Sequence, residues 1–363
     1  MENITEFCTG CRTCEQICPK SCISMKFSSE GFLEPFVDPG QCVNCGLCQK
    51  HCPQNNLKVY PLSEKVFAVK SKNDKELYKS ASGGAFAALA RYFLEQNGAC
   101  VGASYYKGWD VRHKIIRSLD DLPSLQSSKY VQSDMGTTFT EVKQQLDNGK
   151  FVMFTGTPCQ VEGLQNYLRK PYDNLFTIDF VCRAVPSPLV WEKYREFMEK
   201  KFGSEITYAN FREKTYGYHS ANLTLRFANG KKSIENTNTD YMLKSFFKGI
   251  CSRPSCYDCK FREPGRVSDL TVFDCWNITR YVNGLADDDK GYTAVIIQST
   301  KGAKLFEKAK HNLIVYPADP KLLLENDGHM AMENPKYHKN RKEYFEMLNN
   351  GYNIEQVVKK YIP

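Results

Sequence analysis

The chain has 363 residues, 42% of them hydrophobic and 13% aromatic, which allows a sizeable core and predicts two or three domains. Residues 1–60 hold 5 Lys/Arg and 6 Asp/Glu, which leaves a net charge of +9 for the remainder of a chain whose total is +8. The basic residues are scattered and match no nucleic-acid-binding motif, so we expect an anionic ligand or an acidic partner and no nucleic acid. The sequence shows no charged-then-apolar leader and no apolar run of about 18 residues. We therefore expect a soluble cytoplasmic protein without a membrane span, in a compartment that keeps thiols reduced.

The first feature in chain order is a repeated cysteine run with the spacing C-x2-C-x2-C-x3-C-P. In bacterial ferredoxins this spacing binds two [4Fe–4S] clusters, with the fourth cysteine of each run binding the other cluster. The predicted ligands of the first cluster are Cys8, Cys11, Cys14 and Cys52, and those of the second are Cys18, Cys42, Cys45 and Cys48. A zinc site or a disulfide scaffold is the alternative, but zinc sites usually show two C-x-x-C pairs instead of this repeated run.

These runs define a small two-cluster ferredoxin-like domain over residues 1–56, with short strands at 23–27 and 32–37. Cys22 falls outside the spacing and is expected to be a small buried residue instead of a ligand. Residues 57–64 are expected to form a linker. From residue 65 onward, apolar runs typical of strands alternate with amphipathic stretches typical of helices, which predicts a larger α/β domain with a mixed sheet over 65–300. Residues 301–363 are expected to form a mostly helical extension.

The expected elements of the larger domain follow one another closely. The strands are placed at 66–69, 99–105, 111–118, 151–155, 175–181, several positions between 205 and 235, 268–274 and 292–298. The helices are placed at 82–96, 134–148, 158–169, 187–202 and 239–249.

The turn after strand 151–155 is the sharpest motif of this domain. Its residues Gly156, Thr157, Pro158, Cys159 and Gln160 combine an N-cap, a proline at the first helical position and a T-x-x-Q capping box. Free amides at such a helix start can hold a phosphate, and a thiol there could bind iron or lie against a flavin. A well-capped helix with a buried cysteine is an equally good interpretation.

A second group of cysteines, Cys251, Cys256 and Cys259, shows the spacing C-x4-C-x2-C, and Cys182 and Cys275 lie near strand ends. In a cytoplasmic protein such a group indicates a metal site. Zinc and a third [4Fe–4S] cluster both fit this spacing, and the two clusters expected nearby favour the cluster.

Five segments then occur in a characteristic order. They are Ser-Gly-Gly-Ala-Phe (82–86), Ser-Lys-Tyr-Val-Gln-Ser (128–133), Gly-Thr-Pro-Cys-Gln-Val-Glu-Gly-Leu (156–164), Asp-Phe-Val-Cys-Arg-Ala-Val-Pro-Ser-Pro (179–188) and Arg-Pro-Ser-Cys-Tyr-Asp-Cys (253–259). Together they resemble the family of coenzyme F420 hydrogenase/dehydrogenase beta subunits, with a two-cluster ferredoxin domain in front. The family usually has His-Gly after the cysteine at 182, where this chain has Arg183-Ala184, and Gly-Asp-Phe-Trp-Gly where this chain has residues 273–277.

The resemblance implies an FAD site and a third cluster. The implied FAD environment is Ser82, Gly83, Gly84, Lys129, Tyr130, Gly156, Thr157, Pro158, Cys159 and Gln160. The implied ligands of the third cluster are Cys182, Cys256 and Cys259, with Cys251 or Cys159 as the fourth.

The function implied by these features is a flavin- and iron–sulfur-dependent oxidoreductase that exchanges hydride with a small organic substrate, such as coenzyme F420 or another reducible ring. The alternative is an electron-transfer subunit that feeds a partner enzyme, and a third possibility is an iron–sulfur or zinc protein without flavin. A protein redox partner or a homo-oligomer is compatible with either of the first two. Cys159, His219 and Asp274 are candidates for a proton donor, although each is more often structural.

Overall fold

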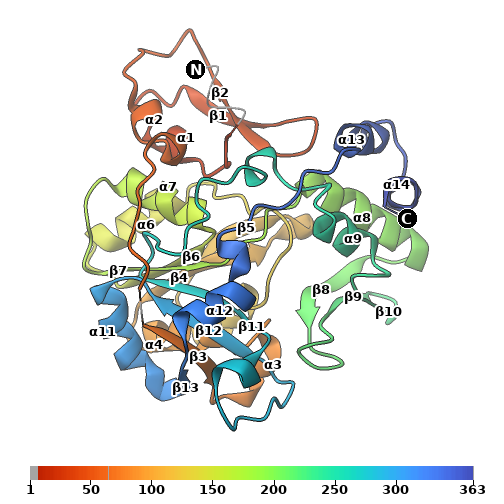
Figure 1. The fold of residues 1–363 in the computed structure, drawn as a ribbon. Helices are drawn as coiled ribbons and strands as arrows, with labels where there is room; N and C mark the ends of the chain where they lie inside the picture. The colour runs from red at the N-terminus through yellow and green to blue at the C-terminus, as the bar shows by residue number, and fades with distance from the viewer. Residues whose placement is uncertain (1–6, 64, 363) are drawn as a thin grey trace.

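A computed structural model describes residues 7–63 and 65–362, and its largest element is an eight-stranded mixed sheet (Figure 1). Four neighbouring strands in its centre, β11, β7, β6 and β4, are parallel, and the strands outside them are antiparallel to their neighbours. The strand order is β13 (Leu313–Pro317), β3 (Val66–Ser71), β12 (Tyr292–Ile297), β11 (Leu270–Cys275), β7 (Leu175–Phe180), β6 (Val152–Gly156), β4 (Ala99–Tyr105) and β5 (Val111–Ile116).

Helices cover both faces of this sheet, because its central strands are apolar on both sides. On one face, α4 (Ala85–Glu95) and α11 (Thr300–Ala309) pack on side chains from β3, β4, β6 and β7. On the other face, α6 (Thr138–Asp147) and α7 (Pro158–Leu168) cover β4, β6 and β7, while α12 (Pro320–Asn326) covers β3, β11 and β12. The short helices α3 (Asp74–Lys79), α5 (Leu122–Leu125) and α10 (Ile278–Tyr281) connect these layers.

A second core forms beside the sheet. The chain between β7 and β11 supplies α8 (Pro188–Phe202), α9 (Tyr241–Phe247) and a three-stranded antiparallel sheet in the order β10-β9-β8. The C-terminal helices α13 (Arg341–Asn349) and α14 (Ile354–Tyr361) pack into the same core. The strands are β8 (Ile206–Glu213), β9 (Asn222–Phe227) and β10 (Lys232–Glu235).

The N-terminal domain is a small cap on one end of the molecule (Figure 1). It consists of α1 (Thr13–Ile17), the antiparallel hairpin of β1 (Ile23–Phe27) and β2 (Leu33–Val37), and α2 (Leu47–Lys50). Its hairpin is tied to the C-terminal helices, since Arg341 pairs with Glu30 and Asn349 Nδ2 donates to Ser29 O at 2.8 Å. The first and last segments of the chain therefore meet.

Most of the expected strands and helices are present, and three differences have clear causes. The helix expected at 82–96 begins only at Ala85, because Gly84 adopts a positive φ of +80° that ends the preceding loop. The boundary expected at residue 300 falls inside the main layer, because β13 pairs with β3 as an edge strand and α11 buries Phe306 against the sheet. The helix α3, capped by Asn73, was not expected.

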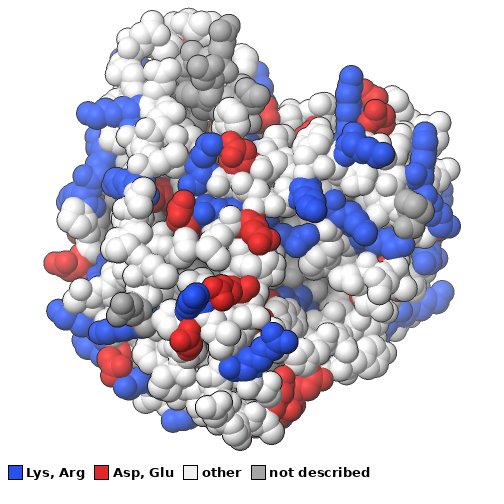
Figure 2. Space-filling model, viewed as in Figure 1, with Lys and Arg blue, Asp and Glu red and all other residues white. Residues whose placement is uncertain are grey.

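No helix within residues 7–63 and 65–362 is long and apolar enough to cross a membrane. Lys, Arg, Asp and Glu are interspersed over the face seen in Figure 2, while the N-terminal domain at the top of that view shows few charged side chains.

Candidate functional site

The site lies where the central parallel strands end. Because β6, β7 and β11 are parallel neighbours, their carboxyl ends meet at one edge of the sheet, which is where ligands bind in open α/β sheets. The chain leaves β6 through Gly156 and Thr157, and it leaves β7 through Val181 and Cys182. Two neighbouring cavities open at this edge, and we call them the cysteine cavity and the large cavity.

Four cysteines line the cysteine cavity: Cys159, Cys182, Cys256 and Cys259. They meet because the segment after β7 runs beside the segment before Cys256. Ser187 N donates to Cys251 O at 2.9 Å, and Arg253 N donates to Val185 O at 2.9 Å. Cys159 comes from the first turn of α7, directly after β6.

Three of these thiols, Cys159, Cys182 and Cys256, would be hard to ionise without a bound cation. Burial and the neighbouring Cys256 raise the pKa of Cys182 to about 12. Burial likewise raises the pKa of Cys256 to about 11, and burial together with Cys259 raises the pKa of Cys159 well above its usual value. Thiolates bind metal, so a metal group here would have to displace these protons.

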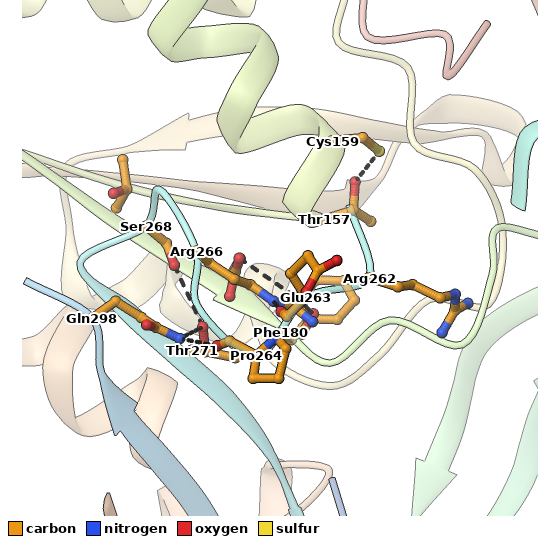
Figure 3. A network of polar contacts seen from close by, with 12 residues as sticks. Thr157, Cys159, Phe180, Arg262, Glu263, Pro264, Arg266, Ser268, Thr271 and Gln298 are labelled. Atoms are coloured by element: carbon orange, nitrogen blue, oxygen red, sulfur yellow. Dashed lines mark hydrogen bonds and ion pairs between the residues drawn. The ribbon is translucent and has the colours of Figure 1, made fainter. Parts of the chain in front are cut away.

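Three arginines, Arg253, Arg262 and Arg266, complete the wall of the cysteine cavity. Figure 3 shows how the loop that carries the last two is held. Arg266 Nη1 donates to Phe180 O at 3.2 Å, and Gln298 Nε2 donates to Pro264 O at 2.7 Å. The loop is thereby fixed to the end of β7 and to the residue after β12, and it places positive charge beside the thiols.

The N-terminal domain docks directly against this cavity. Thr9 contributes to its wall, and Cys8 O accepts hydrogen bonds from Arg253 Nε and from Ser255 Oγ, the latter at 3.0 Å. Thr13 Oγ1 donates to Gly163 O on α7 at 3.0 Å. The first cysteine run therefore lies beside the wall that contains Cys159 and Cys256.

Within the N-terminal domain, Cys8, Cys11, Cys14 and Cys52 are close enough to affect one another's pKa. Burial raises the pKa of Cys14, and Cys11, Cys8 and Cys52 raise it further. Burial and the neighbouring Cys11 raise the pKa of Cys52 to about 11. In the second run Cys45 is exposed, whereas Cys11 and Cys14 of the first run are buried.

The large cavity has a volume of about 1110 Å³, and seven of the ten residues expected around FAD line it. This exceeds the roughly 300–1,000 Å³ of ordinary small-molecule sites. It shares Thr157, Cys182, Ala184 and Val185 with the cysteine cavity, so the two spaces are direct neighbours. The seven residues are Ser82, Gly84, Lys129, Tyr130, Gly156, Thr157 and Gln160.

The other three expected residues lie elsewhere. Pro158 and Cys159 line the cysteine cavity. Gly83 lines neither cavity, because it packs between two strands, where a Cβ would collide with Thr293 N and Val69 O. Its glycine character is therefore required by strand packing.

The expected capping box of α7 is present. Gln160 Oε1 accepts from Thr157 N at 2.9 Å, and Gln160 Nε2 donates to Ser133 Oγ at 3.1 Å. Gln160 therefore ties the start of α7 to the 128–133 loop, and both form part of the large cavity's wall.

Three polar atoms in this wall are buried without a hydrogen-bond partner among the described residues: His113 Nδ1, Thr155 Oγ1 and Arg183 Nε. The His113 ring donates from Nε2 to Thr155 O at 3.1 Å, which leaves Nδ1 as an acceptor. Burial lowers the pKa of His113 to about 4, so the ring is neutral at pH 7. Buried polar atoms of native proteins are normally satisfied, so a ligand with O–H or N–H groups fits here.

The candidate proton donors are spread over the two cavities. Asp274 accepts from Arg212 at 2.8 and 3.1 Å and from Tyr218 Oη at 3.2 Å, which fixes it in an ion pair. His219 pairs with Asp287 at 2.7 Å in an exposed position. His219 and Asp274 line the large cavity, whereas Cys159 lies in the cysteine cavity.

Cys251, one of two alternatives for a fourth ligand, is fully buried in the second core and lines neither cavity. Cys159 occupies the fourth position around the cysteine cavity instead. Sequence reasoning noted Arg183 as a departure from the family pattern that could remodel the substrate side of the site, but it missed His113, Thr155 and Arg212 as wall residues. Thr155 could have been found as the last polar side chain of a buried strand, but the others carry no local signal.

Comparison with known proteins agrees with this architecture. Residues 149–321 match the family model for the C-terminal part of the coenzyme F420 hydrogenase/dehydrogenase beta subunit, and residues 7–56 match the 4Fe–4S dicluster domain. The coenzyme F420-dependent sulfite reductase of Methanocaldococcus jannaschii is 23% identical over 315 residues, which cover 82% of this chain and 45% of that protein.

Two further relatives come from methanogens. The F subunit of F(420)H(2) dehydrogenase from Methanosarcina mazei is 22% identical over 170 residues, which cover 43% of this chain and 46% of that protein. A chain of the F420-reducing [NiFe] hydrogenase complex of Methanosarcina barkeri superposes with a TM-score of 0.48 and 16% identity, covering 83% of this chain and 93% of that one. The chain thus spans less than half the length of the two curated relatives.

Proposed function

Because the chain belongs to the family of coenzyme F420 hydrogenase/dehydrogenase beta subunits and carries a 4Fe–4S dicluster domain in front of it, we propose that it is a flavin- and iron–sulfur-dependent oxidoreductase. In this proposal electrons pass between the two N-terminal clusters and the large cavity through a third cluster in the cysteine cavity. A small organic substrate then gains or loses hydride in the large cavity.

The observation that carries the proposal is the order of the three spaces. The first cysteine run abuts the cysteine cavity through Thr9 and Cys8 O, and the cysteine cavity shares four wall residues with the large cavity. Gly163, against which Cys11 packs, is one helical turn from Cys159 on α7, and one turn rises about 5.4 Å. The arrangement therefore offers a short route from the N-terminal domain to a ligand in the large cavity.

In this proposal the cysteine cavity holds a cluster, because four cysteines line it and the 4Fe–4S dicluster domain docks against it. Zinc holds its sulfur ligands at about 2.3 Å from one centre, whereas the four thiolates of a [4Fe–4S] cluster bind around a larger body. The adjacent arginines would offset the negative charge of such a cluster.

The large cavity fits a flavin. A bound flavin would supply the exchange between single electrons and hydride. The chain's own residues would hold it: Thr155 Oγ1 and His113 Nδ1 offer free hydrogen-bonding capacity, and Tyr130, Phe246 and Phe247 provide an aromatic wall. Lys129, whose ammonium is held by three backbone carbonyls, adds positive charge.

The alternative is an electron-transfer subunit with no substrate of its own. It is favoured by the name of one relative, which is a subunit of a dehydrogenase. Turnover of a small acceptor by the isolated chain distinguishes the two, because a relay protein would reduce no small molecule unless its partner were present.

The experiment that tests the proposal is a cofactor analysis of anaerobically purified protein. We expect flavin absorption and about twelve irons per chain, the content of three [4Fe–4S] clusters. Cys159→Ser should lower the iron content by about four, while Cys251→Ser, a matched buried cysteine outside the cavity, should leave it unchanged. Colourless zinc-loaded protein would refute the proposal, and loss of iron from Cys251→Ser alone would refute the ligand set.

A further inference from the structure

The wall of the large cavity contains a guanidinium whose charge is not neutralised. Arg183 follows Cys182 at the end of β7 and lines the large cavity, but not the cysteine cavity. Its Nη2 donates to Phe247 O at 2.7 Å, and its plane lies 5.3 Å from the centroid of the Phe247 ring. Nη1 meets only the thioether sulfur of Met330 at 3.9 Å, and Nε is buried without a partner. Two of its three nitrogens therefore lack an oxygen acceptor.

The other charged groups of this wall are already engaged. Arg212 is paired with Asp274, and Asp327 accepts from Asn277 N at 2.9 Å and from Asn277 Nδ2 at 2.6 Å. Lys129 donates to the carbonyls of Ser124, Gln126 and Ser127. Arg183 forms no ion pair with any residue in 7–63 or 65–362.

A half-buried arginine with unsatisfied N–H donors destabilises the folded protein unless a bound anion accepts its hydrogen bonds and balances its charge. Burying an unpaired charge is unfavourable, and a guanidinium offers a planar fork that matches a carboxylate or a phosphate. Phe247 holds the fork in place, so little side-chain entropy would be lost on binding. The neighbouring aromatic side chains Tyr130 and Phe246 extend this apolar wall, with their rings tilted relative to one another.

We propose that the substrate of the large cavity is an organic anion, that Arg183 binds its carboxylate or phosphate, and that the aromatic wall contacts its apolar part. This inference rests on the proposed function, because it names the class of molecule that would exchange hydride in that cavity. Arg183 is then a specificity-determining residue of the substrate site.

A bound flavin would carry phosphates of its own, which are the alternative partner for Arg183. Arg183 follows Cys182, which lines both cavities, and so it lies at the end of the large cavity nearest the cysteines. Electron transfer requires the ring of a flavin, not its phosphates, at that end. An anion held by Arg183 is therefore next to the reacting ring, where a substrate binds.

The test uses two probes of equal size, 2-naphthoate and the neutral 2-naphthamide, titrated into the full-length protein and followed by calorimetry. We expect the wild type to bind 2-naphthoate about ten to a hundred times more tightly, which is the range for hydrogen bonds to a charged group. Arg183→Gln should abolish this preference and keep the affinity for 2-naphthamide, and Arg183→Lys should keep part of it. Arg112→Gln, an exposed arginine paired with Asp110, is the control and should keep the full preference.

Flavin and iron contents of the same samples show whether Arg183 serves a cofactor instead of a substrate. Unchanged contents in Arg183→Gln together with a lost preference support the proposal. Loss of flavin would show that Arg183 binds a cofactor phosphate, and loss of about four irons would show that Arg183 stabilises the cluster. Either result overturns the proposal. Equal affinity for the two probes, or a preference that survives in Arg183→Gln, overturns it as well. Protein that takes up no flavin refutes the proposed function instead, and the probe preference is still measurable on it.

Discussion

Eight of the nine cysteines of the N-terminal domain come from two stretches, 8–18 and 42–52, whereas the walls of the large cavity come from segments spread between residues 80 and 330. In the first region a short spacing brings three thiols of each cluster together, and the fourth is expected from the other run. In the second, parallel strands bring distant loops to one edge of a sheet, and no segment is sufficient alone. The cysteine cavity lies between the N-terminal domain and the large cavity. Like the large cavity, it is assembled by the folding of distant loops, since its four thiols come from three separate segments.

The N-terminal domain and the large cavity also differ in how deeply their ionisable groups are buried. The N-terminal domain is small and has one exposed ligand candidate, Cys45, whereas the large cavity is bordered by deeply buried charged groups such as Lys129 and Arg212. A buried charge makes stability depend on pH, while a cysteine run depends mainly on its iron. The two regions should therefore respond to different perturbations.

The largest expected effect concerns Lys129 in the large cavity. Burial lowers the pKa of Lys129 to about 7, so between about pH 7 and 10.5 the unfolded chain binds more protons at this site than the folded one. Stability relative to Lys129→Met should thus rise with pH across this window, by at most about 1.4 kcal/mol per pH unit. Chemical denaturation of the two proteins at pH 6 to 10 measures the difference.

Lys20→Met, which removes an exposed positive charge from the N-terminal domain, is the matched control. A difference between wild type and Lys129→Met that stays constant over the window, or that falls with rising pH, would contradict the prediction. It would mean that the burial of Lys129 does not penalise its charged form.

The second expected effect concerns the contact between the two regions. A Cβ at Gly163 would lie 2.9 Å from Thr13 Oγ1 and 3.1 Å from Cys11 Cβ, so a larger side chain on α7 must displace the first cysteine run. We expect Gly163→Val to lower the free energy of unfolding by about 1–3 kcal/mol, the usual cost of overpacking. In the proposed enzyme, reduction of a bound flavin through the N-terminal domain should also become slower, as measured by stopped flow.

Gly40→Val provides the control for this change, because Gly40 is exposed in the N-terminal domain and the nearest neighbour of a Cβ there is the end of the Asp38 side chain at 3.3 Å. Gly163→Ala should show a smaller effect of the same sign. If Gly163→Val were as stable as the wild type and transferred electrons at the same rate, the close docking on α7 would be refuted.

The contrast between local spacing and tertiary assembly also explains which parts of the fold and of the site could be predicted from the sequence. The cysteine spacing, the apolar strands and the capping box of Thr157 and Gln160 are local patterns, and the structure contains the corresponding elements. Whether Cys159 or Cys251 joins the cysteine cavity depends on which loops meet after folding, and spacing favoured neither. The Ser82–Gly84 motif was ambiguous for the same reason, since the backbone of β3 and β12 requires Gly83. Arg183 was visible only as a departure from a family pattern, because its missing counter-ion is a property of the assembled wall.

The smallest expected effect lies within the N-terminal domain and tests whether local spacing is sufficient there. Cys22 is buried, and its Sγ lies 3.4 Å from Cys18 Sγ, so proximity alone would make it a rival ligand of the second cluster. The spacing assigns that role to Cys18 because its position before Pro19 completes the run.

We therefore expect Cys22→Ala to leave the iron content unchanged and to lower stability by about 1 kcal/mol or less, the loss expected for one small buried group. Cys18→Ala should instead remove about four irons. Iron analysis of both variants shows whether Cys18 or Cys22 is the ligand. Iron loss from Cys22→Ala would show that tertiary contacts select the ligands in this domain too.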